Sequence, residues 1–229
     1  MQYGAGYSID SGKGMEVHIT RHIDKDEYEK ITKSIEYIAF HRRLKEIYLL
    51  VKFNAEQYLE FMRSLTTKAI RIPDRSDNNL VREGNRLLVN YLSSTSMFID
   101  YGKRNLGDAV GTTAKDEFVK MTHNFYDNFV SYRFMALMRH YATHYGFPLH
   151  SYRESLINSS GIFATKSILL KFNGWKHARP DIEKMEESIA LEPHIEFMNS
   201  CIKRLYDYCI YQIHPGIIDT LRAYPLLIG

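Results

Sequence analysis

Residues 80–102 read LVREGNRLLVNYLSSTSMFIDYG, and this stretch decides the fold class. Apolar and small residues recur in it at spacings of three and four, which is the pattern of a single stripe along an α-helix. The stripe consists of Leu80, Val81, Gly84, Leu87, Leu88, Tyr91, Leu92, Thr95, Phe98, Ile99 and Gly102. Glycines within the stripe indicate that a neighbouring helix packs closely against it. The stretch therefore predicts a long amphipathic helix inside a helical bundle.

A second long helix is expected after a break in the pattern at 107–113, running from Ala114 to about Tyr145. Its apolar stripe contains Phe118, Met121, Phe125, Phe129, Tyr132 and Ala136. Gly146 lies just past the expected end and Pro148 beyond it, which is how helices commonly terminate. The two helices are predicted to form a hairpin at the centre of a mainly α fold.

The sequence leaves open whether residues 1–75 belong to the bundle or cover its active face. We expect residues 1–14, rich in glycine and serine, to form a flexible tail, and residues 15–75 to form an N-terminal helical segment. Met15–Thr20 alternates between apolar and polar residues, as a short edge strand does.

Two helices are expected within that segment. The first ends near Phe53, and Asn54 is a plausible N-cap for the second, which reaches Ala69. The turn-forming stretch 70–78, which includes Pro73, predicts a loop before the central hairpin.

Residues 76–229 are predicted to form the main helical bundle with a small β insertion. The alternating, β-branched stretch 161–172 indicates one or two short strands. Helices are expected over Ala178–Ala190 and Pro193–Ile213, the latter with proline in the first turn, where it is tolerated.

The composition limits the class of protein. At 229 residues the chain suits one large domain, and a net charge of +3 shows no overall excess of basic residues of the kind that nonspecific duplex binders carry. Cys201 and Cys209 lie about 12 Å apart on one straight helix, too far for a disulfide. Unpaired thiols, the lack of a secretory signal and the lack of a long apolar run favour a cytoplasmic protein with no membrane segment.

One short motif near the end of the second long helix carries chemistry. Arg139 is followed by the polar residue His140 and, five positions on, by His144, in the sequence Arg-His-Tyr-Ala-Thr-His. This resembles the Arg-x4–6-His motif of the HEPN superfamily, in which a polar residue commonly follows the arginine. The resemblance covers six residues by motif and about residues 80–215 by helical architecture. The wider stretch 132–149 is also similar to segments of uncharacterised bacterial proteins.

The resemblance implies a function. HEPN proteins are helical bundles, often dimers, and many are metal-independent endoribonucleases that act as toxins or in phage defence. It implies RNA as substrate, a 2′,3′-cyclic phosphate and a 5′-hydroxyl as products, and a possible antitoxin or other protein partner. His144 would be the general acid/base, Arg139 the phosphate clamp and His140 a secondary substrate contact. Tyr132 and Arg133, earlier on the same helix, are expected to line the same cleft.

The chemistry of these side chains agrees with that role. Histidine titrates near neutrality and can take the 2′-hydroxyl proton or protonate the leaving group. Arginine stays charged and offers a planar fork of donors to phosphate oxygens. No metal or other cofactor is required for this reaction.

Helix geometry adds a condition. Arg139 and His144 are five positions apart, so they point about 140° apart around the helix axis. One helix therefore does not aim both side chains at one phosphate, whereas a two-fold dimer can combine them from two chains. The ribonuclease hypothesis is thus tied to a homodimer.

Three other interpretations remain open. Arg139 and His144 are also favoured near a helix C-terminus for structural reasons alone. His140 and His144, at i and i+4, share a helix face and could hold a metal if His150 or Asp127 supplied a third ligand. Finally, the bundle could be a non-catalytic module for dimerisation or for binding a protein partner.

Overall fold

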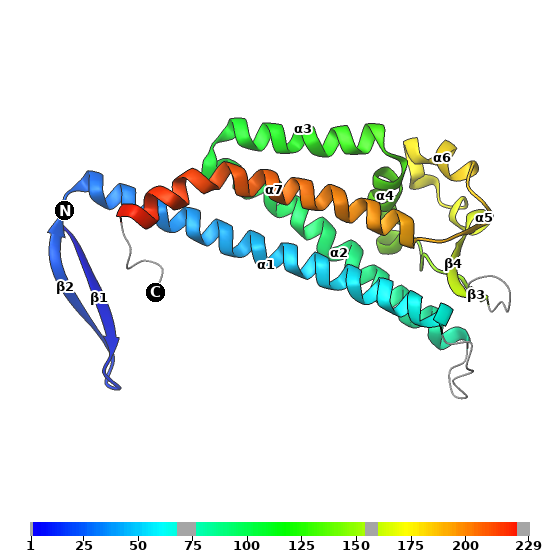
Figure 1. Ribbon diagram of the computed structural model, residues 1–229, viewed down its shortest axis with the longest axis horizontal. Helices are drawn as coiled ribbons and strands as arrows, with labels where there is room; N and C mark the ends of the chain where they lie inside the picture. Colours follow the sequence, from blue (N-terminus) through cyan, green and yellow to red (C-terminus); the bar gives the residue numbers. More distant parts are fainter. Residues whose placement is uncertain (1, 68–76, 154–159, 224–229) are drawn as a thin grey trace.

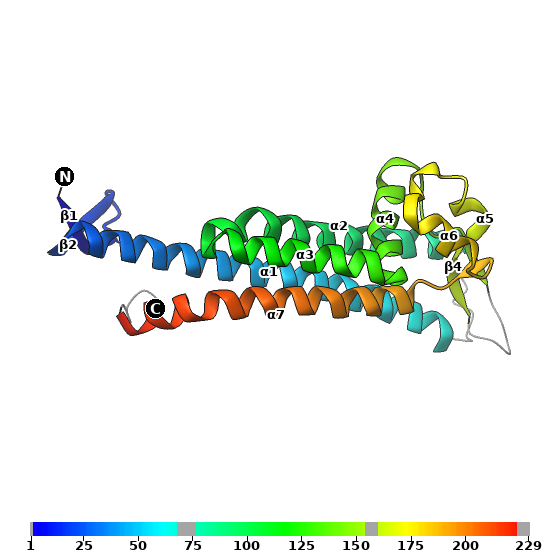
Figure 2. The same cartoon turned by 90° about the horizontal axis from the view of Figure 1, so that it is seen from above.

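The computed structural model describes residues 2–67, 77–153 and 160–223. It is an elongated bundle of long helices with a small mixed module at one end and a β-hairpin at the other (Figures 1 and 2). This confirms the mainly α fold class. The loop expected at 70–78 lies outside the described residues, except for its last two positions, which belong to a helix.

Three long helices form the body of the bundle. Helix α1 (Lys25–Thr67) and helix α2 (Asp77–Val110) run antiparallel, and helix α7 (Glu192–Ala223) lies along α1 (Figure 1). The apolar stripe predicted on α2 is buried, with Leu88, Tyr91 and Phe98 fully inside the core. The predicted final helix is also confirmed, and it extends ten residues beyond Ile213.

Helix α1 corrects the prediction of two N-terminal helices. It continues through Asn54, which is buried and donates its side-chain amide to the backbone carbonyl of Asn90 on α2 at 3.4 Å. The residue expected to cap a helix is therefore a contact between two helices. Because α1 packs along both α2 and α7, most of the segment 15–75 belongs to the bundle.

Helix α3 (Thr112–Asn128) completes the central hairpin with α2. The turn between them is made at Gly111, whose φ of 126° favours glycine. Gly102 of α2 approaches the ring of Phe118, and a Cβ atom added there would lie 2.5 Å from it. The close packing that the glycine in the stripe predicted is thus confirmed.

The second long helix is not continuous, contrary to the prediction of one helix over 114–145. It breaks at Phe129, whose backbone is extended, and resumes as helix α4 (Val130–His144) in a different direction (Figure 2). Its predicted end before Gly146 is confirmed.

The small module packs against one side of α4. Strands β3 (Ser151–Arg153), β4 (Gly161–Thr165) and β5 (Ser188–Ile189) form an antiparallel sheet in that order. Between β4 and β5 lie helix α5 (Lys166–Leu169), the 3-10 helix η1 (Asn173–Ala178) and helix α6 (Arg179–Glu183). A strand within 161–172 is confirmed, whereas the helix expected over 178–190 is only the short α6.

The N-terminus forms a hairpin that stands apart from the bundle. Strand β1 (Tyr3–Asp10) pairs antiparallel with strand β2 (Met15–Ile23), next to the start of α1 (Figure 1). The strand expected at Met15–Thr20 is confirmed. The tail expected at 1–14 instead contains β1, in which Tyr7 and Ile9 alternate with polar residues and the backbone pairs with β2.

Both cysteines lie on α7 as buried free thiols, in agreement with the spacing argument. Burial raises the pKa of the Cys209 thiol to about 12. Within the described part of the chain, no helix is both long and apolar enough to span a bilayer.

Candidate functional site

Helix α4, which carries the motif, is held at its start by Arg133. The guanidinium donates to the backbone carbonyls of Tyr126 at 2.5 Å and Asp127 at 3.0 Å, near the C-terminal end of α3. It also forms an ion pair with Asp181 of α6, with Nη2 to Oδ2 at 2.7 Å and Nε to Oδ2 at 3.0 Å. Arg133 therefore stabilises the break at Phe129 and ties α3, α4 and α6 together.

One face of α4 packs on Trp175, the only tryptophan of the chain. Trp175 is fully buried, and its indole nitrogen donates to the carbonyl of Leu169 at 2.6 Å. Its ring stacks on Phe134 and Tyr141 of α4 at centroid distances of 5.7 and 5.6 Å. These contacts fix the direction in which the other side of α4 faces.

That other side is exposed and carries the motif. Arg139, His140 and His144 are all solvent-exposed, as is Thr143, whose hydroxyl bonds the Arg139 carbonyl at 2.8 Å. The rings of His140 and His144 lie 4.6 Å apart, and His140 lies 5.6 Å from Phe172. The structure thus brings the two histidines together on one flank.

Arg139 occupies the other flank, in a groove of about 530 Å³ between α4 and α2. Besides Arg139 and Thr143, the groove is lined by Ser93, Ser96, Met97, Asp100, Tyr101, Arg104 and Asn105. Two arginines and one carboxylate give the groove a positive balance. His144 is not among the lining residues, so Arg139 and His144 of one chain face different surfaces, as the helix geometry predicted.

The motif side chains make few interactions. Across residues 2–67, 77–153 and 160–223, no carboxylate lies within ion-pair distance of Arg139, His140 or His144. Exposed cations and imidazoles without a carboxylate partner are available to a ligand, which distinguishes Arg139 sharply from Arg133 on the same helix.

The two further residues predicted to bind substrate lie elsewhere. Tyr132 is 3% exposed and packs against Phe125 in the core. Burial raises its pKa well above the ordinary value for tyrosine, so its hydroxyl stays protonated at neutral pH. Arg133 is committed to Asp181 and the end of α3. The structure therefore does not bring either side chain to the groove of Arg139.

A metal site at His140 and His144 lacks a third ligand in this arrangement. His150 instead contacts the Tyr141 hydroxyl at 3.4 Å and accepts a hydrogen bond from the Thr165 amide at 2.9 Å. Among the residues whose placement is described, no three histidine, cysteine or acidic side chains are grouped as metal ligands. Zinc sites in proteins use at least three protein ligands, so the histidine pair alone does not make one.

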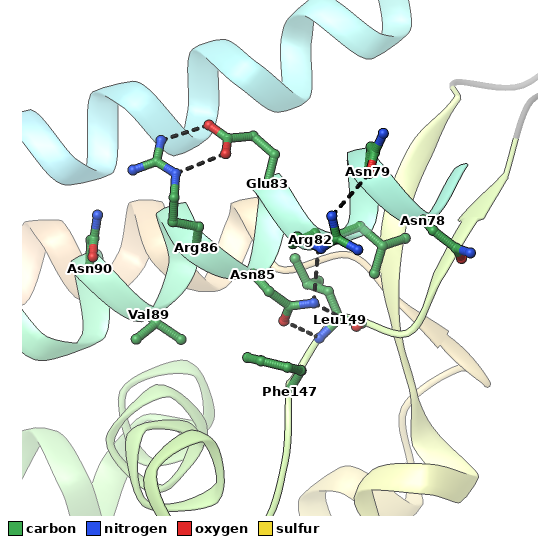
Figure 3. Close-up of a pocket in the computed structure, with 11 residues that line it drawn as sticks. Asn78, Asn79, Arg82, Glu83, Asn85, Arg86, Val89, Asn90, Phe147 and Leu149 are labelled. Atoms are coloured by element: carbon green, nitrogen blue, oxygen red, sulfur yellow. Dashed lines mark hydrogen bonds and ion pairs between the residues drawn. The ribbon is translucent and has the colours of Figure 1, made fainter. Parts of the chain in front are cut away.

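A larger pocket, of about 770 Å³, which the sequence did not predict, lies beside α2 (Figure 3). It is lined by Asn78, Asn79, Val81, Arg82, Glu83, Asn85, Arg86, Val89, Asn90, Phe147 and Leu149. The missed signal was the polar stripe of α2, in which Arg82, Arg86 and Asn90 recur at every fourth position opposite the apolar stripe. Phe147 lies between Gly146 and Pro148, the two residues that end the helix in the sequence.

Comparison of the chain with protein-family models, with curated proteins and with solved structures finds no match. The fold defines a mainly α-helical protein.

Proposed function

We propose that this protein is a metal-independent endoribonuclease of the HEPN type that acts as a homodimer. The observation that carries the proposal is the placement of Arg139 and His144. Both are exposed at the end of a helix that is rigidly held from behind, and Arg139 faces a groove with a second arginine, Arg104. Two arginines that line one groove concentrate positive charge there, which attracts an anionic ligand such as a phosphate.

The proposed reaction is internal transesterification of RNA. His144 takes the proton of the 2′-hydroxyl, whose oxygen attacks the adjacent phosphorus. The bond from phosphorus to the 5′-oxygen breaks, and that oxygen leaves with a proton donated by His144 in its role as general acid. Arg139 binds the phosphate oxygens, where its fixed charge stabilises the pentacoordinate transition state. The products are a 2′,3′-cyclic phosphate and a 5′-hydroxyl.

The dimer is required because Arg139 and His144 face different surfaces of one chain. An exposed apolar patch adjoins the groove and supports self-association: Leu49, Leu50 and Phe53 of α1 are 43, 41 and 55% exposed. They line a hollow of about 490 Å³ together with Met97, which also lines the groove of Arg139. Contiguous exposed apolar surface of this kind is typical of protein–protein contacts.

The same patch favours the second candidate function, a non-catalytic module for dimerisation or partner binding. In either case we place the protein in the cytosol, and the enzyme would be a toxin or phage-defence component held in check by an antitoxin. Velocity sedimentation of the purified protein tests the shared premise. A dimer agrees with both candidates, and a monodisperse monomer at assay concentration contradicts the proposed ribonuclease.

Incubation of several RNAs with the purified protein in EDTA tests the reaction. The wild type is expected to produce cyclic-phosphate ends, and His144→Ala is expected to cleave at least ~100-fold more slowly, since general acid–base catalysis contributes about 10²–10⁴. His123→Ala is the matched control, because His123 is an exposed histidine on α3, away from the motif. Equal rates for all three proteins would attribute the cleavage to a contaminant and reject the proposal.

A further inference from the structure

The pocket of about 770 Å³ beside α2 combines three kinds of side chain that suit one ligand (Figure 3). An aromatic ring, Phe147, offers a flat apolar face. The amides of Asn78, Asn79 and Asn90 offer donors and acceptors, and the guanidinium groups of Arg82 and Arg86 also line the pocket, with Arg82 donating to Asn79 Oδ1 at 3.2 Å. Aromatic faces, amides and guanidinium groups are the groups by which proteins hold an unstacked nucleobase and its phosphate.

Phe147 is exposed although it is rigidly supported. Its side chain is 70% exposed, which is among the highest values for the large apolar residues of the chain. Two residues further on, Leu149 is clamped to α2 by Asn85, which accepts from the Leu149 amide at 2.9 Å and donates to its carbonyl at 2.8 Å. Asn85 is itself only 4% exposed.

A buried amide that makes both of these hydrogen bonds fixes the backbone beside Phe147, since leaving its buried polar groups unpaired would be unfavourable. The aromatic ring is therefore presented to solvent from a fixed loop, and it contributes little to the core. Figure 3 shows it reaching from that loop toward Val89 and Asn85. Such a ring is preorganised for stacking.

The pocket and the groove of Arg139 follow one another along α2. The pocket uses α2 residues from Asn78 to Asn90, and the groove begins at Ser93, less than one turn later. The arginines from Arg82 to Arg104 span about 33 Å of helix. Together the two hollows contain four arginines and two carboxylates, Glu83 and Asp100, and Arg86 is paired with Glu83 at 2.6 Å. The surplus of positive charge matches a phosphate backbone.

We propose that this pocket binds an unstacked nucleobase of single-stranded RNA, with Phe147 as the stacking platform, and that the strand continues along α2 to the groove of Arg139. The inference rests on the proposed function in taking RNA as the ligand, and it adds the surface that selects single-stranded substrate. The contacts of Phe147, Asn79 and Asn90 are made outside the reacting groups, so they affect binding and not the chemical step.

Fluorescence anisotropy with a labelled 2′-O-methyl RNA 12-mer tests it, because this probe lacks the attacking hydroxyl and cannot be cleaved. Phe147→Ala is expected to weaken binding by about tenfold or more, in line with base stacking on other aromatic side chains. Phe147→Tyr should bind like the wild type. Tyr211→Ala is the matched control, because Tyr211 is 76% exposed on α7, away from both hollows.

The outcomes separate the two proposals. Wild-type affinity in Phe147→Ala, equal losses in Phe147→Ala and Tyr211→Ala, or no binding of the probe by the wild type would each overturn the nucleobase pocket, whatever the result of the cleavage assay. Binding that depends on Phe147 in a protein that cleaves no RNA would leave the pocket standing and reject the proposed function. Equal affinity for a duplex of the same sequence would overturn the selection of single strands.

Discussion

The two ends of helix α4 differ in what their arginines do. At the start of the helix, Arg133 is largely buried and joined to Asp181 and to two backbone carbonyls. At the end, Arg139 is exposed and has no carboxylate partner within the described ranges. The same residue type, six positions apart, thus serves the fold at one end and remains available to a ligand at the other.

Because of this difference, substitutions on the two sides of α4 should affect different properties of the protein. Substitutions on the supported side of α4 should lower the free energy of unfolding, whereas substitutions on the exposed side should leave it unchanged and affect only ligand binding or catalysis. A chain whose exposed motif proved essential for stability would not fit this description. The following predictions run from the largest expected effect to the smallest.

Trp175→Ala should produce the largest loss of stability. The substitution removes a fully buried ring that stacks on Phe134 and Tyr141, and large-to-small changes of this kind cost about 3–5 kcal/mol. Urea denaturation followed by far-UV circular dichroism measures it. Trp175→Phe, which keeps most of the apolar volume, should lose clearly less. A loss below 1 kcal/mol for Trp175→Ala would show that α4 is not supported from behind as described.

Arg133→Ala should be the next largest. It leaves Asp181 partly buried without its cation and frees two carbonyls at the end of α3, for a loss of about 2 kcal/mol, less than for a fully buried pair. In a protein of this size that lowers Tm by about 4–8 °C. Asp181→Ala should give a similar loss, because it breaks the same ion pair from the other side. Wild-type Tm in both variants would mean that the pair does not hold the break at Phe129.

Acid should weaken the protein through two partly buried histidines that contact α4, His150 and His194. Burial lowers the pKa of His150 and of His194 below the ordinary value of 6.5. The unfolded chain then binds protons more strongly than the folded one, so this contribution to stability is complete above pH 6.5 and is lost as the pH falls through and below that value. The urea midpoint should be lower at pH 5.5 than at pH 7.5.

His194→Gln isolates that effect, because it removes one of the titrating groups beside Ser131, whose hydroxyl contacts the imidazole at 2.9 Å. The variant should show a smaller difference between the two pH values than the wild type does. An equal or larger difference would assign the acid sensitivity to other groups.

Arg139→Ala and His144→Ala should have the smallest effect on stability, within about 0.5 kcal/mol of the wild type, as is usual for exposed positions. Urea denaturation of both variants at pH 7.5 checks this. The result matters for every activity assay, because only folded variants can assign a loss of cleavage to the missing side chain. A loss above 1 kcal/mol in the free energy of unfolding of either variant would contradict the claim that the exposed end of α4 does not contribute to stability.

Periodicity predicted the helices that bury one apolar stripe. Helix α2 and helix α7 follow from their own sequences, because every third or fourth residue packs into the core. The divergence of Arg139 and His144 around the helix axis also follows from helix geometry alone, whereas their exposure depends on which face of α4 packs against the module. The sequence did not predict the helix boundaries that depend on contacts with residues far away in the chain. The helix break at Phe129 contains neither glycine nor proline, and it is stabilised through Arg133 by Asp181, 48 positions away.

The surroundings of several side chains could not be predicted for the same reason, because their contact partners are distant in the sequence. Asn54 is a residue type that commonly caps helices, but its side-chain amide donates to the backbone carbonyl of Asn90 on α2 instead. Phe147 lies in a stretch typical of a helix end, and only the clamp from Asn85 shows that its ring is held in solvent beside a pocket. Tyr132 and Arg133 were expected beside Arg139 because they share a helix, yet the packing of α3, α6 and the core fixes them elsewhere.

The most direct test of a site shared by two chains is a mixing experiment. Arg139→Ala and His144→Ala proteins, each inactive, are unfolded together, refolded and assayed for RNA cleavage in EDTA. In half of the dimers one of the two shared clefts then combines an intact Arg139 with an intact His144, so activity should return to about one quarter of the wild-type level. Mixed dimers that form but remain inactive would contradict the account.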